Sequence, residues 1–108
     1  MHTITAEEMN EHPQKLLDDA LRGEVALVTA KGVPVMAALP LAAGVPSQAA
    51  LVDLAATLFD RGEISLGKSA RIAGLSYTEM IDELGRRQID VVRLGPGELE
   101  RELAAFGP

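Results

Sequence analysis

The segment from Gly62 to Ser69 has residues that could bind phosphate. Its sequence GEISLGKS fits G-x-x-x-x-G-K-[ST], the loop whose backbone amides surround the phosphates of a nucleotide. Such a loop follows a buried strand, whereas the residues that end in Phe59-Asp60-Arg61 have helical spacing. We therefore interpret Gly62 as a tight turn, Ser65 as a helix N-cap and Gly67 as a place of close packing, rather than as parts of a nucleotide site.

Two other catalytic patterns are incomplete. Ser65 and Lys68 have the S-x-x-K spacing of penicillin-recognising enzymes, but the accompanying S-D-N and K-T-G sequences are absent from the chain. His2 and His12 could join a catalytic triad only with a distant Ser and Asp, and their spacing is not that of metal ligands. We therefore expect no enzyme activity, no cofactor and no metal site.

The residues from Ser65 to Arg87 predict a helix-turn-helix. Ala70 is small enough for two helices to cross, Gly74 allows a positive φ in the turn, and Met80 would anchor the second helix. The start of that helix would reach base edges and its two arginines would reach phosphates. The candidate DNA-binding residues are Lys68, Ser76, Tyr77, Thr78, Arg86 and Arg87. Because Glu79, Asp82 and Glu83 would repel phosphates, a packing or protein-binding module is an equal alternative.

Before these residues, the spacing predicts a small α+β domain. His2-Thr3-Ile4 favours a short strand, and Thr5 with Glu8 has the capping-box spacing of a helix start. A second helix is expected between Pro13 and Gly23. Two β-rich runs, 25–29 and 33–39, flank a turn at 30–32, and Pro34 places the second run at an edge or at a strand start.

A linker rich in Pro and Gly, residues 40–47, is expected to separate this domain from a helical one. Beyond it, the spacing predicts a helix over 51–59, a helix from Leu66 to Ala73 capped by Ser65, and a third helix from Ser76 to about Arg87. A short strand at 91–94 and a helix after Pro96 complete the expectation. The predicted domains are therefore 1–45 and 46–108.

Composition limits the class of protein. The chain of 108 residues is 47% hydrophobic but only 3% aromatic, so its core consists of small aliphatic side chains and favours oligomerisation. Cysteine is absent, and no run approaches the length of a membrane span, so we expect a cytoplasmic protein without a membrane partner. The net charge of −6 disfavours non-specific DNA binding but suits a basic protein partner.

Both halves resemble antitoxins. Residues 3–8 and 23–37 resemble the prevent-host-death (Phd/YefM) family, and within them the run from Gly23 to Val35 follows G-E-x-h-x-h-T-x-x-G-x-P-V, where h is apolar. That resemblance implies a domain that dimerises through its sheet. Asn10 stands where Phd-like proteins tend to have Arg, which makes dimerisation rather than DNA contact the expected role of this domain. Residues 58–76 are similar to small uncharacterised-protein-family (UPF) antitoxins, usually encoded beside PIN-domain toxins, whose signature is G-x-I-S-L-G-K-A-A.

These observations predict an α+β homodimer that is the antitoxin of a type II toxin–antitoxin system. It would occlude a cognate toxin, a PIN-domain-like ribonuclease as the resemblance implies, and would regulate its own operon by binding operator DNA. The candidate toxin-binding residues are Arg93, Leu99, Arg101, Leu103 and Phe106. Arg93 or Arg101 would enter the carboxylate cluster that holds Mg²⁺ in such a toxin. The alternative is a DNA-binding transcriptional regulator without a toxin partner.

Overall fold

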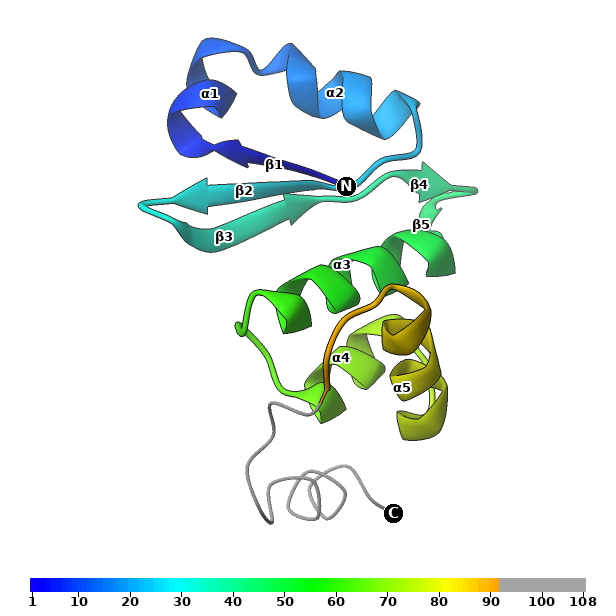
Figure 1. Cartoon of the computed structure of the whole chain (residues 1–108). Coiled ribbons are helices and arrows are strands. Elements are labelled where there is room, and N and C mark those ends of the chain that lie inside the picture. The colour runs from blue at the N-terminus through cyan, green and yellow to red at the C-terminus, as the bar shows by residue number, and fades with distance from the viewer. Residues whose placement is uncertain (92–108) are drawn as a thin grey trace. The chain divides into compact units, whose positions relative to one another are not determined.

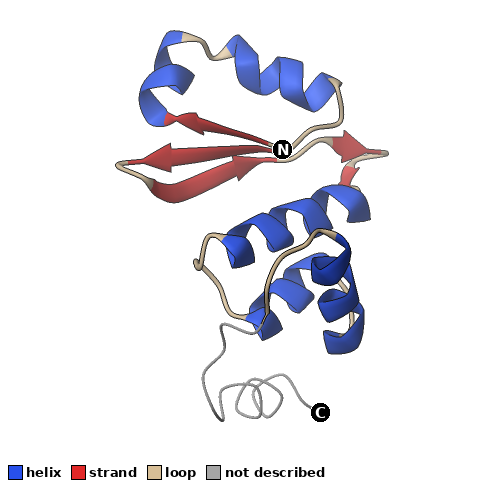
Figure 2. Ribbon diagram, in the orientation of Figure 1, coloured by secondary structure: helices blue, strands red, loops and turns tan. Residues whose placement is uncertain are grey.

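The computed structural model describes residues 1–91. Within this range the fold is α+β, as predicted, and Figure 2 shows its helices and strands. The elements in chain order are β1 (His2–Thr5), α1 (Ala6–Glu11), α2 (Gln14–Leu21), β2 (Ala26–Ala30), β3 (Val33–Ala38), β4 (Leu41–Ala42), β5 (Val45–Pro46), α3 (Gln48–Asp60), α4 (Leu66–Ala73) and α5 (Tyr77–Arg86).

The chain divides into two compact units, one of residues Met1–Leu54 and one that begins at Ala55. The division falls inside α3. The functional domains expected from the sequence, 1–45 and 46–108, stay a prediction. None of the helices in residues 1–91 combines the length and the apolar composition needed to cross a bilayer.

The first unit is built on a three-stranded sheet of order β1-β2-β3. β1 pairs with β2 in parallel, and β2 pairs with β3 in antiparallel orientation. Because parallel neighbours need a crossover connection, α1 and α2 run between β1 and β2 and lie along one face of the sheet (Figure 1). The central strand β2 is buried from Ala26 to Thr29, and Ile4 of β1 is buried beside it.

Local hydrogen bonds at the start of α1 confirm the predicted capping box. The Thr5 hydroxyl accepts a hydrogen bond from the Glu8 backbone N–H at 3.1 Å, and the Glu8 carboxylate accepts one from the Thr5 backbone N–H at 3.3 Å. Pro13 is the N-cap of α2, at the break that the sequence predicts. Both short helices therefore begin directly after a residue that the sequence marks as a helix start.

The hairpin of β2 and β3 is also confirmed. Lys31 and Gly32 have φ angles of 53° and 79°, the two positive values that a tight type I′ hairpin turn requires. Pro34 lies on β3, an edge strand, where its missing N–H removes no hydrogen bond from the sheet interior. A bulge opposite Val28 and Thr29 shifts the register of this strand.

The predicted linker is partly wrong. Residues 41–46 form a second, very short hairpin in which Leu41 pairs with Pro46 and Ala42 pairs with Val45. Strands of two residues are too short to show an alternating pattern, so the sequence showed only the turn residues around them.

The described part of the second unit, residues 55–91, consists of helices and the turns between them. Small and apolar side chains are buried on each of them: Ala55, Ala56 and Phe59 on α3, Leu66, Ala70 and Ala73 on α4, and Tyr77, Met80 and Leu84 on α5. Ser65 caps α4 by accepting the Lys68 backbone N–H at 3.1 Å. The segment that resembles a phosphate loop therefore follows a helix, as the sequence interpretation expected: residues 62–65 lie between α3 and α4, and residues 66–69 form the start of α4.

Candidate functional site

The α4–α5 pair holds all of the predicted DNA-binding residues. The C-cap of α4 is Gly74, whose φ of 69° lies in the left-handed region, and this turns the chain toward α5. Ser76, the residue directly before α5, is its N-cap. The two helices pack against each other through their buried faces.

A complete capping box fixes the start of α5. The Ser76 hydroxyl accepts the Glu79 backbone N–H at 3.1 Å, and the Glu79 carboxylate accepts the Ser76 backbone N–H at 2.9 Å. This hydrogen bond from the Ser76 backbone, followed by the one that involves the Ser76 side chain, holds the pKa of Glu79 below its ordinary value. An ionised carboxylate therefore remains at the end of α5 where a DNA-reading helix would meet bases.

Tyr77 does not lie at that surface. Its exposed fraction is 8%, and it continues the buried row that Met80 and Leu84 form at helical spacing. The sequence analysis placed Tyr77 among the DNA-binding residues, and its burial corrects this assignment because a core ring cannot reach a base edge. Thr78 and Lys68, by contrast, are exposed.

At the other end of α5, Glu83 pairs with both predicted phosphate-binding residues. Arg86 Nη2 lies 2.6 Å from Glu83 Oε2, and Arg87 Nε lies 3.1 Å from Glu83 Oε1. Hydrogen bonds from Arg86 first and Arg87 second lower the pKa of Glu83. The positive charge of this helix end is thus partly neutralised within the helix.

The predicted DNA contacts do not form one cluster. Ser76 and Thr78 stand at the start of α5 and the arginines stand at its end, roughly 15 Å away at 1.5 Å per residue. The predicted toxin-binding residues, Arg93, Leu99, Arg101, Leu103 and Phe106, lie outside the described residues.

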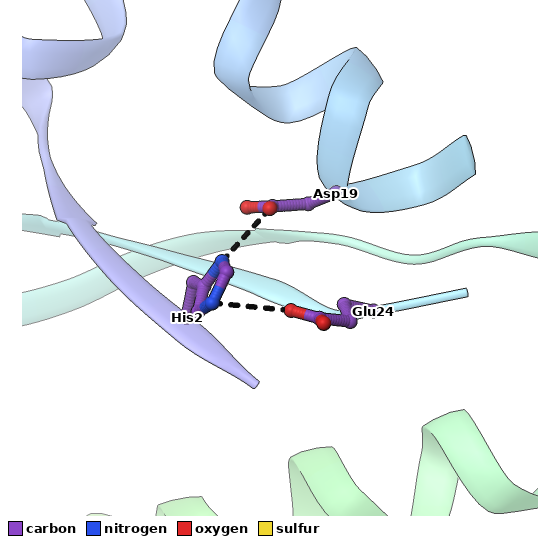
Figure 3. Close-up of side chains that lie close together, drawn as sticks. All are labelled: His2, Asp19 and Glu24. Carbon is purple, nitrogen blue, oxygen red and sulfur yellow. Dashed lines mark hydrogen bonds and ion pairs between the residues drawn. The ribbon is translucent and has the colours of Figure 1, made fainter. Parts of the chain in front are cut away.

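In the first unit the structure brings together three side chains that the sequence analysis did not connect (Figure 3). His2 of β1 contacts Asp19 of α2 through Nδ1, at 2.8 Å from Oδ1, and Glu24 through Nε2, at 3.2 Å from Oε2. Arg22 Nη2 reaches the same Asp19 Oδ1 at 2.6 Å. No spacing rule could reveal this cluster, because its members come from β1, α2 and the loop before β2.

Comparison with known proteins gives one family match, which covers the second half of the chain and part of the first. The model of the uncharacterised protein family UPF0175 matches residues 34–107. The chain belongs to this family. The UPF0175 match runs from β3 through α3, α4 and α5 and continues beyond the described residues. The predicted relation of this half to a UPF family is therefore confirmed.

The UPF0175 match does not include residues 1–33. Most of the resemblance to the Phd/YefM family lies there, and it stays a prediction. No curated protein and no solved structure gives a significant match to the chain.

Proposed function

We propose that this UPF0175 chain is the antitoxin of a type II toxin–antitoxin system and neutralises its toxin by stoichiometric binding. The observation that carries the proposal is the family match over residues 34–107, because UPF0175 is often linked to toxin–antitoxin loci. Covering the active site of a toxin is a binding function. It requires a surface that is complementary to the toxin and does not require a set of catalytic residues.

The proposed partner is a PIN-domain-like ribonuclease. A chain of net charge −6 is suited to cover the basic surface with which such an enzyme would hold RNA. Within the C-terminal segment, Arg93 or Arg101 would pair with the carboxylates that bind Mg²⁺ in the toxin. Leu99, Leu103 and Phe106 would supply apolar contact.

Growth rescue tests this proposal. The chain is co-expressed with a candidate PIN-domain-like toxin sought among the neighbouring genes, and wild type should restore growth. The Arg93→Ala, Arg101→Ala double variant should lose most of the rescue, because the metal-binding carboxylates of the toxin would be left uncovered. The Arg86→Ala, Arg87→Ala double variant removes the same charge from α5 and should still rescue. Full rescue by both variants would rule out the insertion of Arg93 or Arg101 into the active site of the toxin. If wild type does not restore growth, the tested protein is not the toxin that this chain neutralises.

The second part of the proposal is a homodimer formed through the sheet. β3 is an edge strand whose Val33 and Val35 are 54% and 59% exposed. Apolar side chains on an edge strand favour pairing with another chain, and a second copy presents the same edge.

The third part is autoregulation through DNA binding by the α4–α5 pair, in which Ser76 and Thr78 would face bases and Lys68, Arg86 and Arg87 would face phosphates. The pairing of both arginines with Glu83 leads to a direct test. Glu83→Gln should remove the ion pair that each arginine makes with Glu83 and should tighten binding to operator DNA severalfold, with a steeper salt dependence. Asp82→Asn removes the same charge from an exposed neighbour and should tighten binding less.

Gel shifts at several salt concentrations measure this difference. If both variants bind DNA equally, the arginines of α5 are not the phosphate contacts. DNA binding together with failure of the rescue experiment would favour the alternative function, a transcriptional regulator without a toxin partner.

A further inference from the structure

We propose that His2, Asp19 and Glu24 form a binding site for a divalent transition-metal ion, with Zn²⁺ as the ion that suits these donors best. One ligand atom from each residue lies within 4.8 Å of the other two (Figure 3). The site lies wholly within the first unit and is independent of the proposed antitoxin function.

The donor types decide the class of ion. Imidazole nitrogen suits zinc, copper, iron and nickel. Zinc sites in proteins also use carboxylate oxygens together with imidazole nitrogens. With bond lengths near 2.1 Å, ligand atoms around a tetrahedral Zn²⁺ stand roughly 3.4 Å apart. Because Nδ1 of His2 faces Asp19 and Nε2 faces Glu24, the imidazole ring would have to turn until one of its nitrogens and both carboxylates face the ion. Three protein ligands leave the fourth position for water, as in open zinc sites.

One oxygen of Glu24 could accept a cation. Glu24 Oε2 is a buried atom of a side chain that is 36% exposed; it makes no hydrogen bond to any described residue, and His2 Nε2 lies 3.2 Å away as an ion-pair partner. A buried carboxylate oxygen without a hydrogen bond is unfavourable, and a metal ion would satisfy it.

Asp19 gives a second indication. Its side chain is only 4% exposed, and both His2 and Arg22 direct nitrogen atoms at the same oxygen, Oδ1. The site therefore already gathers nitrogen atoms around a buried carboxylate. A metal ion would take the place of the contact between His2 and Asp19, and Arg22, 56% exposed, can turn toward water.

A pocket reaches two of the three proposed ligands, His2 and Asp19, and gives the ion a path to them. It has a volume of about 460 Å³ and opens on His2 and Asp19, with Lys15, Asp18 and Arg22 around it. This space admits a hydrated ion and the water that would complete its coordination. Once bound, the ion would tie β1 to α2 and to the loop that precedes β2.

Nuclear magnetic resonance of the histidine rings gives the sharpest test, because the chain has only two histidines. Zn²⁺ added to full-length protein without a histidine tag should shift one ring nitrogen of His2 and leave His12 unchanged. The apparent affinity should rise with pH, because metal and proton compete for the same nitrogen. Equal shifts of both rings, or no shift of His2 at millimolar Zn²⁺, would overturn the proposal.

Calorimetric titration with Zn²⁺ separates the ligands from other surface groups. His2→Ala should abolish the heat of binding, and Glu24→Gln should weaken binding by more than about tenfold. His12→Ala and Glu11→Gln are matched controls at exposed positions outside the cluster and should bind like wild type. Asp19 is buried and paired, so Asp19→Asn is informative only if circular dichroism shows that it folds. If Glu24→Gln binds Zn²⁺ as tightly as Glu11→Gln, the three-residue site is wrong.

Discussion

Ser76 caps the start of α5 through two hydrogen bonds with Glu79. Ser76→Ala removes the hydroxyl acceptor and should lower the free energy of unfolding by about 1 kcal/mol. Thr78→Ala, two positions later on the exposed face, removes a hydroxyl without removing a cap. Urea unfolding followed by circular dichroism compares the two. If both variants lose the same free energy of unfolding, the Ser76 cap does not stabilise α5.

Glu79 makes the same cap depend on pH. Its pKa in the folded chain lies below the ordinary 4.5, because the Ser76 backbone N–H donates to the ionised carboxylate. A carboxyl with a depressed folded pKa contributes stability that is present above 4.5 and is lost as the pH falls through the folded pKa. Wild type should therefore exceed Glu79→Gln in stability at neutral pH, and the difference should vanish in strong acid.

Thermal unfolding from neutral pH to strong acid measures this difference. Glu63→Gln, at an exposed site before α4, corrects for the loss of one negative charge. A difference between wild type and Glu79→Gln that stays constant with pH would contradict the assigned hydrogen bond.

At the scale of the element, two glycines around α5 should respond in opposite directions to the same substitution. Gly74 has a φ of 69°, where an L side chain is strained, and Gly85 lies inside α5; a Cβ at either position would meet nothing within 4 Å. Gly74→Ala should therefore cost about 1 kcal/mol through the backbone alone. Gly85→Ala should gain about 0.5 to 1 kcal/mol, because alanine favours the helix.

Equilibrium denaturation of the two single variants and of the double variant checks both signs. Each effect arises in the backbone and the sites share no contact, so the double variant should equal their sum. A stabilising Gly74→Ala would show that α4 does not end in a left-handed residue.

At the scale of the whole molecule, the exposed edge of the sheet predicts association. Val35→Lys places a charge on β3 and should convert a dimer into monomers, because a buried lysine without a partner is unfavourable in a strand interface. Leu41→Lys is the matched control, since Leu41 is 64% exposed and lies on β4, outside the three-stranded sheet.

Sedimentation velocity over a range of micromolar concentrations distinguishes the variants. Wild type and Leu41→Lys should sediment as dimers and Val35→Lys as a monomer. A monomeric wild type would remove the homodimer from the proposed function, and a dimeric Val35→Lys would move the interface away from β3.

The sequence alone determined the features that depend on neighbours within about four residues. The caps at Thr5, Ser65 and Ser76 and the turn at Lys31 and Gly32 were predictable, because each is stabilised by its own backbone or by a side chain three positions away. For the same reason, the phosphate-loop pattern at Gly62 could be set aside before the structure was known.

Only the tertiary structure decided which distant residues meet. The parallel pairing of β1 with β2 closes a crossover of two helices, and it places His2 beside Asp19, 17 positions along the chain. The burial of Tyr77 was decided in the same way, since a residue at a helix start can face either solvent or the core. Periodicity reports which faces are apolar, but contact between elements depends on strand order and packing, for which the sequence of a single chain carries no local signal.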